Sequence, residues 1–173
     1  ISSANSINIA RLIPQSFYYF NGCAKLKASK KIIVSVPSGN FGNLTAGILS
    51  KKMGLPIHKF IAATNENKTV PEFFINNKYT PAKSISTISN AMDVGNPSNM
   101  KRIMDIYNDI NSLKKDLDSW SFSDELTKQC ILETFDKNKY LLDPHSAVGL
   151  LGLSKFLNRS KDYEGLFLGT AHP

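Results

Sequence analysis

A strand, a glycine-containing turn, a helix and a second strand follow one another between residues 32 and 63, and this order limits the fold more than any other feature. The β-branched run Ile32-Ile33-Val34-Ser35-Val36 predicts a buried strand, and the apolar periodicity from Leu44 to Met53 predicts a helix that ends near Gly54. Pro56 stops that helix, and residues 57–63 predict the second strand. Strand, helix and strand within about 30 residues form a βαβ unit with parallel strands. The predicted fold class is therefore α/β, with a parallel-rich open sheet and flanking helices.

The turn Pro37-Ser38-Gly39-Asn40-Phe41-Gly42-Asn43 stands at the carboxyl end of a strand, where ligands bind in such sheets. Because Gly39 and Gly42 have no side chain, the backbone can approach a ligand closely and adopt positive φ. The amides that open the next helix point at the same place, where the helix dipole favours an anion. Two interpretations stay open at this point: a phosphate cradle, and an ordinary βα turn whose glycines serve tight packing. The turn is not a nucleotide P-loop, because it lacks the Gly-Lys-Ser/Thr ending, and it does not fit the dinucleotide pattern GxGxxG.

The composition narrows the class of protein. A chain of 173 residues with 42% hydrophobic residues can bury one real core, so we expect one domain or a large piece of one. It begins at Ile1 rather than Met and ends directly after a strand-like run, so we expect a piece of a longer polypeptide. It has no apolar span of membrane length and no basic-then-apolar leader, so we expect a soluble, cytoplasmic protein. Cys23 and Cys130 lack metal or redox spacing, so we expect reduced thiols and no metal site.

The net charge of +7 raises the question of a nucleic-acid partner. The basic residues are scattered, mixed with Asp and Asn, and not interleaved with aromatic side chains. A nucleic-acid-binding surface is expected to gather its basic residues on one face or element. We therefore expect a solvated surface and no nucleic-acid partner.

The first helix is predicted from residue 6 to residue 21, because apolar residues recur there at helical spacing. The stripe expected to face the core consists of Ile9, Leu12, Ile13, Phe17 and Phe20. Asn5 or Ser6 is the expected cap. Pro14 is expected to kink or break the helix, and Gly22 is expected to end it.

Further helices and a last strand follow along the chain. The expected helices cover residues 70–75, residues 97–110, a segment that starts at residue 123, and residues 146–157; the expected strand covers residues 166–168. Residues 80–99 predict an irregular polar loop, which in a compact domain is usually functional or a surface excursion. The stretch from 108 to 139 is expected to be helical.

Five segments of the sequence resemble threonine synthase, in the same order along the chain. They are Asn5-Ser6-Ile7-Asn8-Ile9-Ala10-Arg11, the segment from Val34 to Gly47, Phe60-Ile61-Ala62-Ala63-Thr64-Asn65, Ser89-Asn90-Ala91-Met92-Asp93-Val94, and Leu168-Gly169-Thr170-Ala171-His172-Pro173. The resemblance covers nearly the whole chain and is weakest between residues 108 and 139. It implies a pyridoxal-phosphate enzyme of fold type II, like tryptophan synthase β.

The resemblance implies cofactor-binding roles for the turn and for the end of the last strand. In this family a Gly-Asn-Phe-Gly-Asn loop holds the phosphate of pyridoxal phosphate, which implies that role for Gly39, Asn40, Phe41, Gly42 and Asn43. The family places a threonine hydroxyl against the pyridine nitrogen, which implies that role for Thr170. Because a neutral hydroxyl does not stabilise a protonated ring, we expect a weaker electron sink than with a carboxylate partner.

The resemblance also implies a substrate, O-phosphohomoserine, which carries a carboxylate and a phosphate. Ser6, Asn8 and Arg11 are the implied contacts. Asn8 and Arg11 lie one helical turn apart, and the planar fork of arginine binds two anion oxygens at once. A helix cap and an ordinary surface arginine explain these residues nearly as well. His145 and His172 receive no role.

No residue of the sequence is assigned a catalytic role. Pyridoxal-phosphate enzymes hold their cofactor through a lysine, and in threonine synthases it lies in an upstream Lys-Asp pair that nothing in this sequence matches. We therefore expect residues 1–173 to be mainly the later half of the catalytic domain, with residues 1–25 bridging to a smaller domain. We expect them to be inactive without the remainder of the polypeptide.

The function that the resemblance implies is the conversion of O-phosphohomoserine and water into threonine and phosphate, by γ-elimination and β-addition. Two alternatives stay open. One is a related fold type II lyase, such as a threonine-synthase-like phospho-lyase or a serine/threonine dehydratase-like enzyme. The other is a non-enzymatic phosphate-binding module.

Overall fold

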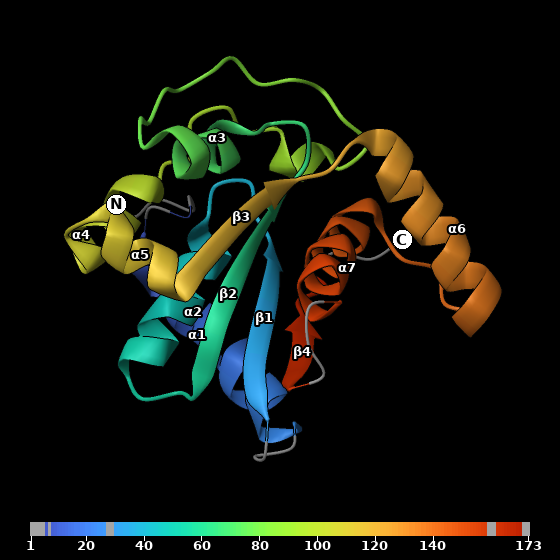
Figure 1. Ribbon diagram of the computed structural model, residues 1–173, viewed down its shortest axis with the longest axis horizontal. Coiled ribbons are helices and arrows are strands. Elements are labelled where there is room, and N and C mark those ends of the chain that lie inside the picture. The colour runs from blue at the N-terminus through green and yellow to red at the C-terminus, as the bar shows by residue number, and fades with distance from the viewer. Residues whose placement is uncertain (1–5, 7, 27–29, 159–161, 171–173) are drawn as a thin grey trace.

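A single parallel sheet organises the part of the chain that the computed structural model describes, which is residues 6, 8–26, 30–158 and 162–170. Its strand order is β3-β2-β1-β4, and every neighbouring pair is parallel (Figure 1). The strands are β1 (Lys31–Pro37), β2 (Ile57–Thr64), β3 (Leu117–Ser121) and β4 (Tyr163–Phe167). Helix α2 (Gly42–Lys52) connects β1 to β2, so the predicted βαβ unit and the predicted α/β class are both confirmed.

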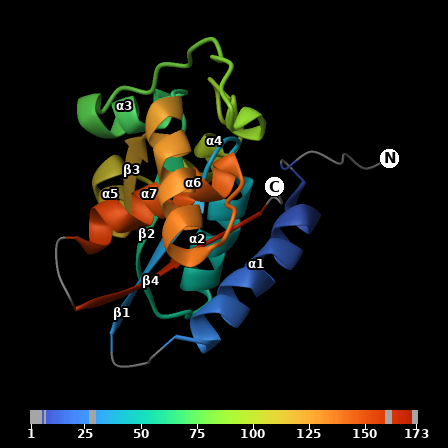
Figure 2. The ribbon, with the colours of Figure 1, turned by 90° about the vertical axis from the view of Figure 1, so that its right-hand side faces the viewer.

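Helices cover both faces of this sheet (Figures 1 and 2). The larger core cluster joins one face to α1 (Ile9–Ala24), α2, α3 (Thr69–Asn76), α4 (Met100–Tyr107) and α5 (Ile110–Asp116). The other face packs against α7 (Pro144–Leu157), and α6 (Asp124–Asn138) packs on α7. Because both faces are covered, the central strand is a continuous buried run rather than an alternating one.

Strand β1 has side chains that pack against the helices on both faces of the sheet. Val34 and Val36 point into the larger core, whereas Ile33 points toward α7. Ser35 also faces α7, and its hydroxyl donates to the Gly149 carbonyl at 2.7 Å. Helix α7 approaches this closely because of Gly152, where a Cβ would lie 2.8 Å from Ser35 Oγ.

The stretch between residues 108 and 139, expected to be helical, contains a strand, and this expectation was wrong. Asn108 adopts a left-handed conformation with φ 62° and ends α4, so the helix predicted for residues 97–110 is shorter than expected. Asp109 then caps α5, and β3 follows and pairs with β2. Leu113 and Leu117 are both fully buried and lie four residues apart, a spacing that a helix shares. The five-residue edge strand β3 is too short for the alternating pattern of a strand to stand out from this helical spacing.

Helix α1 begins later and ends later than predicted. Its cap is Asn8, whose side chain accepts from the Ala10 amide at 3.0 Å, so the prediction of Ser6 as cap was wrong. The other predicted cap, residue 5, lies outside the described residues. Pro14 lies inside the helix without breaking it, and the helix passes Gly22 to end at Ala24. Gly22 serves packing instead, since a Cβ there would lie 2.5 Å from the Leu166 side chain.

The predicted core stripe of α1 is largely exposed. Helix α1 buries Leu12, Ser16, Tyr19 and Cys23. From the predicted stripe, Ile9, Ile13 and Phe17 are 57%, 58% and 63% exposed. The helix is apolar on two sides, and the sequence period could not tell which side this chain buries.

The irregular segment between α3 and α4 lies across the carboxyl ends of the strands (Figure 1). It contains one turn of 3₁₀ helix, η1 (Asn90–Met92), so the predicted polar loop is confirmed. A cluster of hydrogen-bonded polar side chains fixes this segment to the end of β2. Its members are Asn65, Asn67, Thr87, Ser89 and Asp93. In the described part of the chain, no helix combines the length and the apolar character that crossing a membrane requires.

Candidate active site

The turn between β1 and α2 is anchored at its start and strained at its end. The Ser38 amide donates to the Ala63 carbonyl of β2 at 2.8 Å, which holds the turn at the carboxyl edge of the sheet. Phe41 has φ 62° and is only 3% exposed. A bulky residue rarely adopts this left-handed conformation, and such strain is characteristic of ligand-binding turns. The strained Phe41 therefore favours the prediction of a ligand-binding turn over that of an ordinary βα turn.

Phe41 also leaves the N-terminus of α2 open. Among the described residues, no side chain caps α2, and the same holds for α3 and α4, whereas α1, α5, α6 and α7 are capped by Asn8, Asp109, Ser123 and Asp143. The first amides of an uncapped helix keep their hydrogen-bond donors, and the helix dipole adds positive potential there. The start of α2 can therefore bind an anion.

Both glycines of the turn lie against other segments. A Cβ on Gly39 would lie 2.8 Å from Met92 Cα, so the turn touches the backbone of η1. A Cβ on Gly42 would lie 2.9 Å from Ser6 Cβ, so the residues before α1 touch the start of α2. These close approaches require glycine at both positions.

All six residues predicted to bind the cofactor line one cavity of about 150 Å³. They are Gly39, Asn40, Phe41, Gly42, Asn43 and Thr170, and Ala91, Met92 and His145 line the same cavity. A neighbouring cavity of about 640 Å³ shares Asn43 and Thr170 and extends toward Gln15 and Tyr18 of α1. The structure therefore brings the two ends of the predicted cofactor site together from strand ends that are far apart in the sequence.

Asn43 is held in place by Tyr19 of α1. The Tyr19 hydroxyl lies 2.8 Å from the Asn43 carbonyl oxygen and 3.0 Å from its side-chain oxygen, and it donates to this pair of acceptors. Burial raises the pKa of Tyr19 well above its usual value, so the hydroxyl stays protonated and remains a donor. The ring also fills the space that Gly47 leaves, since a Cβ there would lie 2.4 Å from Tyr19 Cε1.

Asn40 connects the turn to the segment that leads into α4. Its side-chain oxygen accepts from the Ser98 amide at 3.1 Å and from the Ser98 hydroxyl at 3.2 Å. Its carbonyl accepts from Asn99 Nδ2 at 2.9 Å. The Asn40 side chain thus has a structural task, and its predicted role at the phosphate stays a prediction.

The predicted substrate residues gather at the start of α1. Ser6 Oγ accepts from Asn99 Nδ2 at 3.3 Å, next to the cofactor turn. Asn8 caps α1, and the Arg11 amide donates to the Asn8 carbonyl at 3.0 Å in the first helical turn. Ser6 therefore lies beside the predicted cofactor site. Asn8 and Arg11 line neither of the two cavities, and their substrate contacts stay predictions.

A cluster at the start of α7 was missed by the sequence reasoning. Asp143 caps α7 by accepting from the His145 and Ser146 amides at 2.8 and 3.2 Å, and from the Ser146 hydroxyl. His145 Nδ1 lies 3.0 Å from Asp143 Oδ1, and the Ala91 amide donates to His145 Nε2 at 3.2 Å. Burial raises the pKa of Asp143, but hydrogen bonds from Ser146 and His145 outweigh it, so the pKa lies below the usual value. The Asp-Pro-His sequence signals a helix start, but only the fold places it beside the glycine turn.

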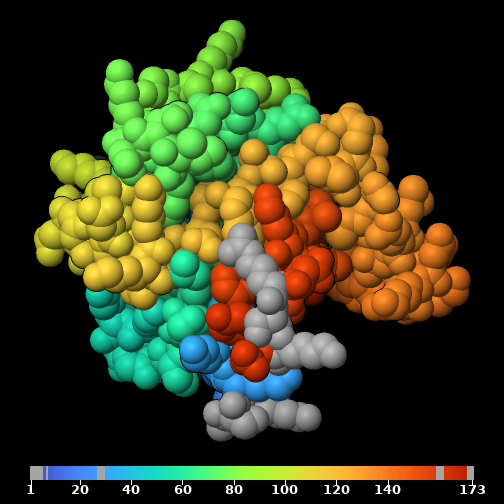
Figure 3. Space-filling view, in the orientation of Figure 1, coloured from blue at the N-terminus to red at the C-terminus, as the bar shows by residue number. Residues whose placement is uncertain are grey.

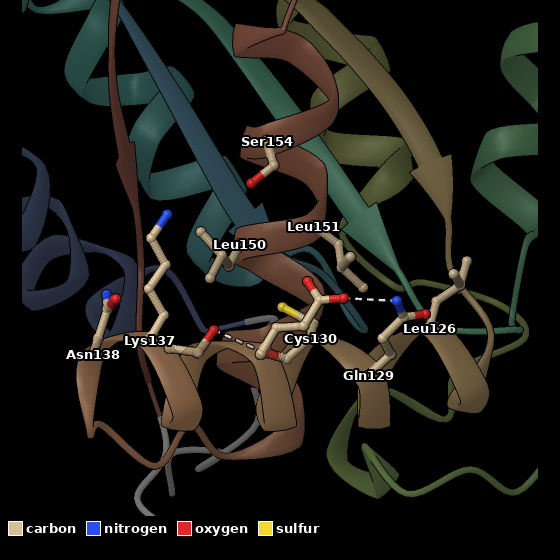
Figure 4. A pocket seen from close by; sticks show the side chains of 10 residues that line it. Leu126, Gln129, Cys130, Lys137, Asn138, Leu150, Leu151 and Ser154 are labelled. Atoms are coloured by element: carbon tan, nitrogen blue, oxygen red, sulfur yellow. Dashed lines mark hydrogen bonds between the residues drawn. The ribbon is translucent and has the colours of Figure 1, made fainter.

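A separate hollow, between α6 and α7, has a volume of about 440 Å³ (Figure 4). Its walls are the two helices, and α6 stands out from the body of the molecule in the space-filling view (Figure 3). On the α6 side of this hollow, Gln129 Nε2 donates to Glu133 Oε1 at 2.6 Å. No strand end or glycine turn contributes to it, so it is not the site expected in a parallel sheet. No group of His, Cys, Asp or Glu in the described residues is arranged to hold a metal ion.

Comparison with solved structures identifies the class of fold. The serine racemase of Dictyostelium discoideum superposes with a TM-score of 0.68 at 17% identity, and the match covers 96% of this chain and 52% of that one. Together with the threonine synthase structures below, this likeness shows the fold of the type II pyridoxal-phosphate enzymes, as predicted. No protein-family model matches the sequence.

The particular relatives are threonine synthases. Threonine synthase of Buchnera aphidicola subsp. Schizaphis graminum is 46% identical over 100% of this chain and 40% of its own length. The crystal structure of the Escherichia coli threonine synthase has a TM-score of 0.91 at 44% identity, covering 99% of this chain and 40% of that one. The pyridoxal-phosphate-bound threonine synthase from Brucella melitensis has a TM-score of 0.93 at 30% identity, covering 99% and 42%. The chain is thus a threonine synthase homologue over its full length, and it spans about 40% of the length of the relatives that it matches.

Proposed function

We propose that this chain is the cofactor-binding part of a threonine synthase that converts O-phosphohomoserine and water into threonine and phosphate. The observation that carries the proposal is that all of Gly39–Asn43, at the start of α2, and Thr170, after β4, line the same cavity of about 150 Å³. The identity to threonine synthases over the whole chain supports the same reaction. The serine racemase, at 17% identity, shares the fold alone, so it supports no second function.

The residues of the cavity fit pyridoxal phosphate. The cofactor carries a phosphate at one end and a ring nitrogen at the other. The uncapped start of α2 offers amide donors to the phosphate, and Thr170, which lines the same cavity, offers a hydroxyl to the ring nitrogen. When bound, the cofactor supplies a conjugated system that spreads the negative charge left by proton removal. A relative with this cofactor bound, from Brucella melitensis, supports the assignment.

Each group of residues has its own task in this proposal. Gly39, Asn40, Phe41, Gly42 and Asn43 hold the phosphate and thereby fix the position of the ring. Thr170 orients the ring nitrogen without adding charge to it. Ser6, Asn8 and Arg11 bind the anionic groups of the substrate, and Ser6 lies against the turn at Gly42. This division orients the substrate over the cofactor.

The proposal includes the rest of the polypeptide. We infer that residues 1–173 belong mainly to the later half of the catalytic domain, and that the lysine that holds the cofactor lies elsewhere. Helix α1 is the proposed bridge to a smaller domain, because Ile9, Ile13 and Phe17 expose a continuous apolar stripe on it. The proposed compartment is the cytoplasm, which suits the buried free thiols of Cys23 and Cys130.

Turnover by the complete polypeptide that contains this sequence tests the proposal. With pyridoxal phosphate and O-phosphohomoserine, we expect threonine and inorganic phosphate to form in equal amounts. Residues 1–173 alone are expected to form neither. Release of phosphate without threonine would indicate a different phospho-lyase, and the absence of cofactor binding by the complete polypeptide would indicate a phosphate-binding module; either result overturns the proposal.

A further inference from the structure

His145 is a partly buried histidine for which the proposed reaction has no use. Its side chain is 15% exposed and lies on the wall of the cavity that the glycine turn lines. It is held from both sides: Asp143 Oδ1 lies 3.0 Å from Nδ1, and the Ala91 amide lies 3.2 Å from Nε2. Both ring nitrogens are therefore engaged with groups of the protein.

These partners determine the tautomer. A backbone amide can only donate, so Nε2 accepts from Ala91 with its lone pair. The carboxylate of Asp143 accepts, so the ring proton is on Nδ1. The aspartate that caps α7 thus orients the imidazole, and the imidazole in turn holds a backbone amide of η1.

The Ala91 amide is next to Met92, the residue on which the glycine turn packs. A Cβ on Gly39 would lie 2.8 Å from Met92 Cα and 3.0 Å from the Ala91 carbonyl oxygen. The two flanks of this segment are fixed by the polar cluster at the end of β2, through Asn65 to Ser89 and to Asp93. The middle touches Gly39. There the Ala91 amide is held by His145, and the buried Met92 side chain packs on Ala63, Phe122 and Val148. Moving the middle would move the wall against which the phosphate-binding turn is shaped.

We propose that His145 is a positioning residue for the cofactor site. Through its Nε2 atom it holds the turn at Ala91 and Met92 against Gly39, and thereby keeps the phosphate-binding turn in its binding shape. The inference rests on the proposed function, because it assigns His145 a part in holding pyridoxal phosphate. His145 acts through the backbone of η1 and does not touch the reacting atoms.

Two substitutions separate the two ring nitrogens. In His145→Asn, the side-chain amide reaches only the position of Nδ1, so it keeps a donor for Asp143 and loses the acceptor for Ala91. In His145→Gln, the side-chain oxygen reaches the position of Nε2 and keeps that acceptor. The two variants are matched, because each replaces the ring by an amide and keeps one of the two hydrogen bonds.

Three measurements on the complete polypeptide decide the matter. They are hydrogen exchange of the Ala91 amide without cofactor, the Kd for pyridoxal phosphate from its absorbance on titration, and the Tm. We expect His145→Asn to raise both the exchange rate and the Kd by about fivefold, the effect of one lost hydrogen bond. His145→Gln should stay within about twofold of the wild type in both, since it keeps the acceptor.

The inference is overturned if the two variants have the same Kd, or if only the Tm separates them, because His145 would then be merely structural. Unchanged exchange at Ala91 in His145→Asn overturns it as well. Failure of the proposed function looks different: the wild type itself then binds no pyridoxal phosphate. In that case the cofactor role of His145 falls with it, and the exchange rates still report whether His145 holds Ala91.

Discussion

Helices α2 and α7 both begin at the same cavity, yet their first turns differ in every respect that matters for binding. The start of α7 is satisfied from within, because Asp143 accepts from two backbone amides, a hydroxyl and a histidine. The start of α2 follows the left-handed Phe41 and has no side-chain cap among the described residues. A helix start that carries its own carboxylate has no donors left for a ligand anion, whereas an open one does.

This difference indicates that the two helix starts have different roles in the proposed site, one in binding and one in support. In the proposed site, the open start of α2 is the binding element, and contacts from Tyr19, Met92 and Ser6 hold its shape. The capped start of α7 is a support, which reaches η1 through His145 and the last strand end through Ser146, whose Oγ lies 3.1 Å from the position of a Cβ on Gly169. Damage to the start of α2 should therefore appear first in cofactor affinity, and loss of the Asp143 cap of α7 first in stability.

The largest effect on binding is expected from Gly39→Ala. The new Cβ would lie 2.8 Å from Met92 Cα, and a backbone atom cannot move aside cheaply. We expect overpacking to cost about 1–3 kcal/mol of stability and to weaken pyridoxal phosphate binding at least about tenfold. Absorbance titration and urea denaturation of the complete polypeptide measure the two quantities.

Gly54→Ala is the matched control at the other end of α2. Gly54 has φ +105° and nothing within 4 Å of the position of a Cβ. Alanine there should cost about 1 kcal/mol of backbone strain and leave the Kd for the cofactor unchanged. An equal loss of affinity in both variants would contradict the difference between the binding turn and the rest of the helix.

The next largest effect, which is on stability, is expected from Asp143→Ala at the start of α7. Losing a buried cap with several charge-assisted hydrogen bonds should cost about 2 kcal/mol of stability near neutral pH. The pKa of Asp143 is lowered from its usual 3.8. Its stabilising effect is therefore fully present above that value and is lost as the pH falls through the lower, folded-state pKa.

Urea denaturation at pH values from neutral to below 3.8 measures this effect, as the difference between wild type and variant. We expect the difference to shrink only below the usual pKa of aspartate. Asp109→Ala, which removes the exposed cap of the short helix α5, should have a smaller effect at neutral pH. A difference between wild type and Asp143→Ala that stays constant with pH would show that the carboxylate charge does not matter.

A smaller effect is expected from Tyr19→Phe, which removes the hydroxyl that holds Asn43. The Asn43 carbonyl loses its 2.8 Å bond, and we expect a cost of about 1 kcal/mol. Cofactor affinity should fall by less than in Gly39→Ala, since the turn keeps its backbone shape. Tyr18→Phe is the control, because Tyr18 is 58% exposed; it should change stability by less than about 0.5 kcal/mol. If Tyr18→Phe weakens binding as much as Tyr19→Phe, the contact to Asn43 is not what holds the turn.

The sequence predicts the binding element far better than its supports. The β-branched run, the two glycines and the apolar helix are local signals, and they define the βαβ unit and the turn without knowledge of the rest. The contacts that shape the turn come from residues far away in the sequence. Tyr19 lies 24 residues before Asn43, whereas Met92 and His145 lie 53 and 106 residues after Gly39. No local pattern encodes such distances.

The predictions from the sequence fail where the spacing of apolar residues fits two different structures. Helix α1 is apolar on two sides, and this chain buries the side with Tyr19 rather than the side with Ile13 and Phe17. Strand β3 is hidden because its buried Leu117 continues a helical spacing from Leu113. In both cases tertiary packing, not local preference, decides the outcome.

The smallest effect is expected where the binding turn and its support meet, at Thr170. This residue is exposed on the cavity wall, and the preceding Gly169 packs on Ser146 at the capped start of α7. Thr170→Val removes the hydroxyl and keeps the shape, so cofactor affinity should fall by about fivefold, as for one hydrogen bond. Stability should change by less than about 0.5 kcal/mol, because the side chain is exposed. Thr170→Ser keeps the hydroxyl and should bind the cofactor like the wild type. If Thr170→Val also binds like the wild type, Thr170 belongs to the supporting side of the site and does not contact the ring nitrogen.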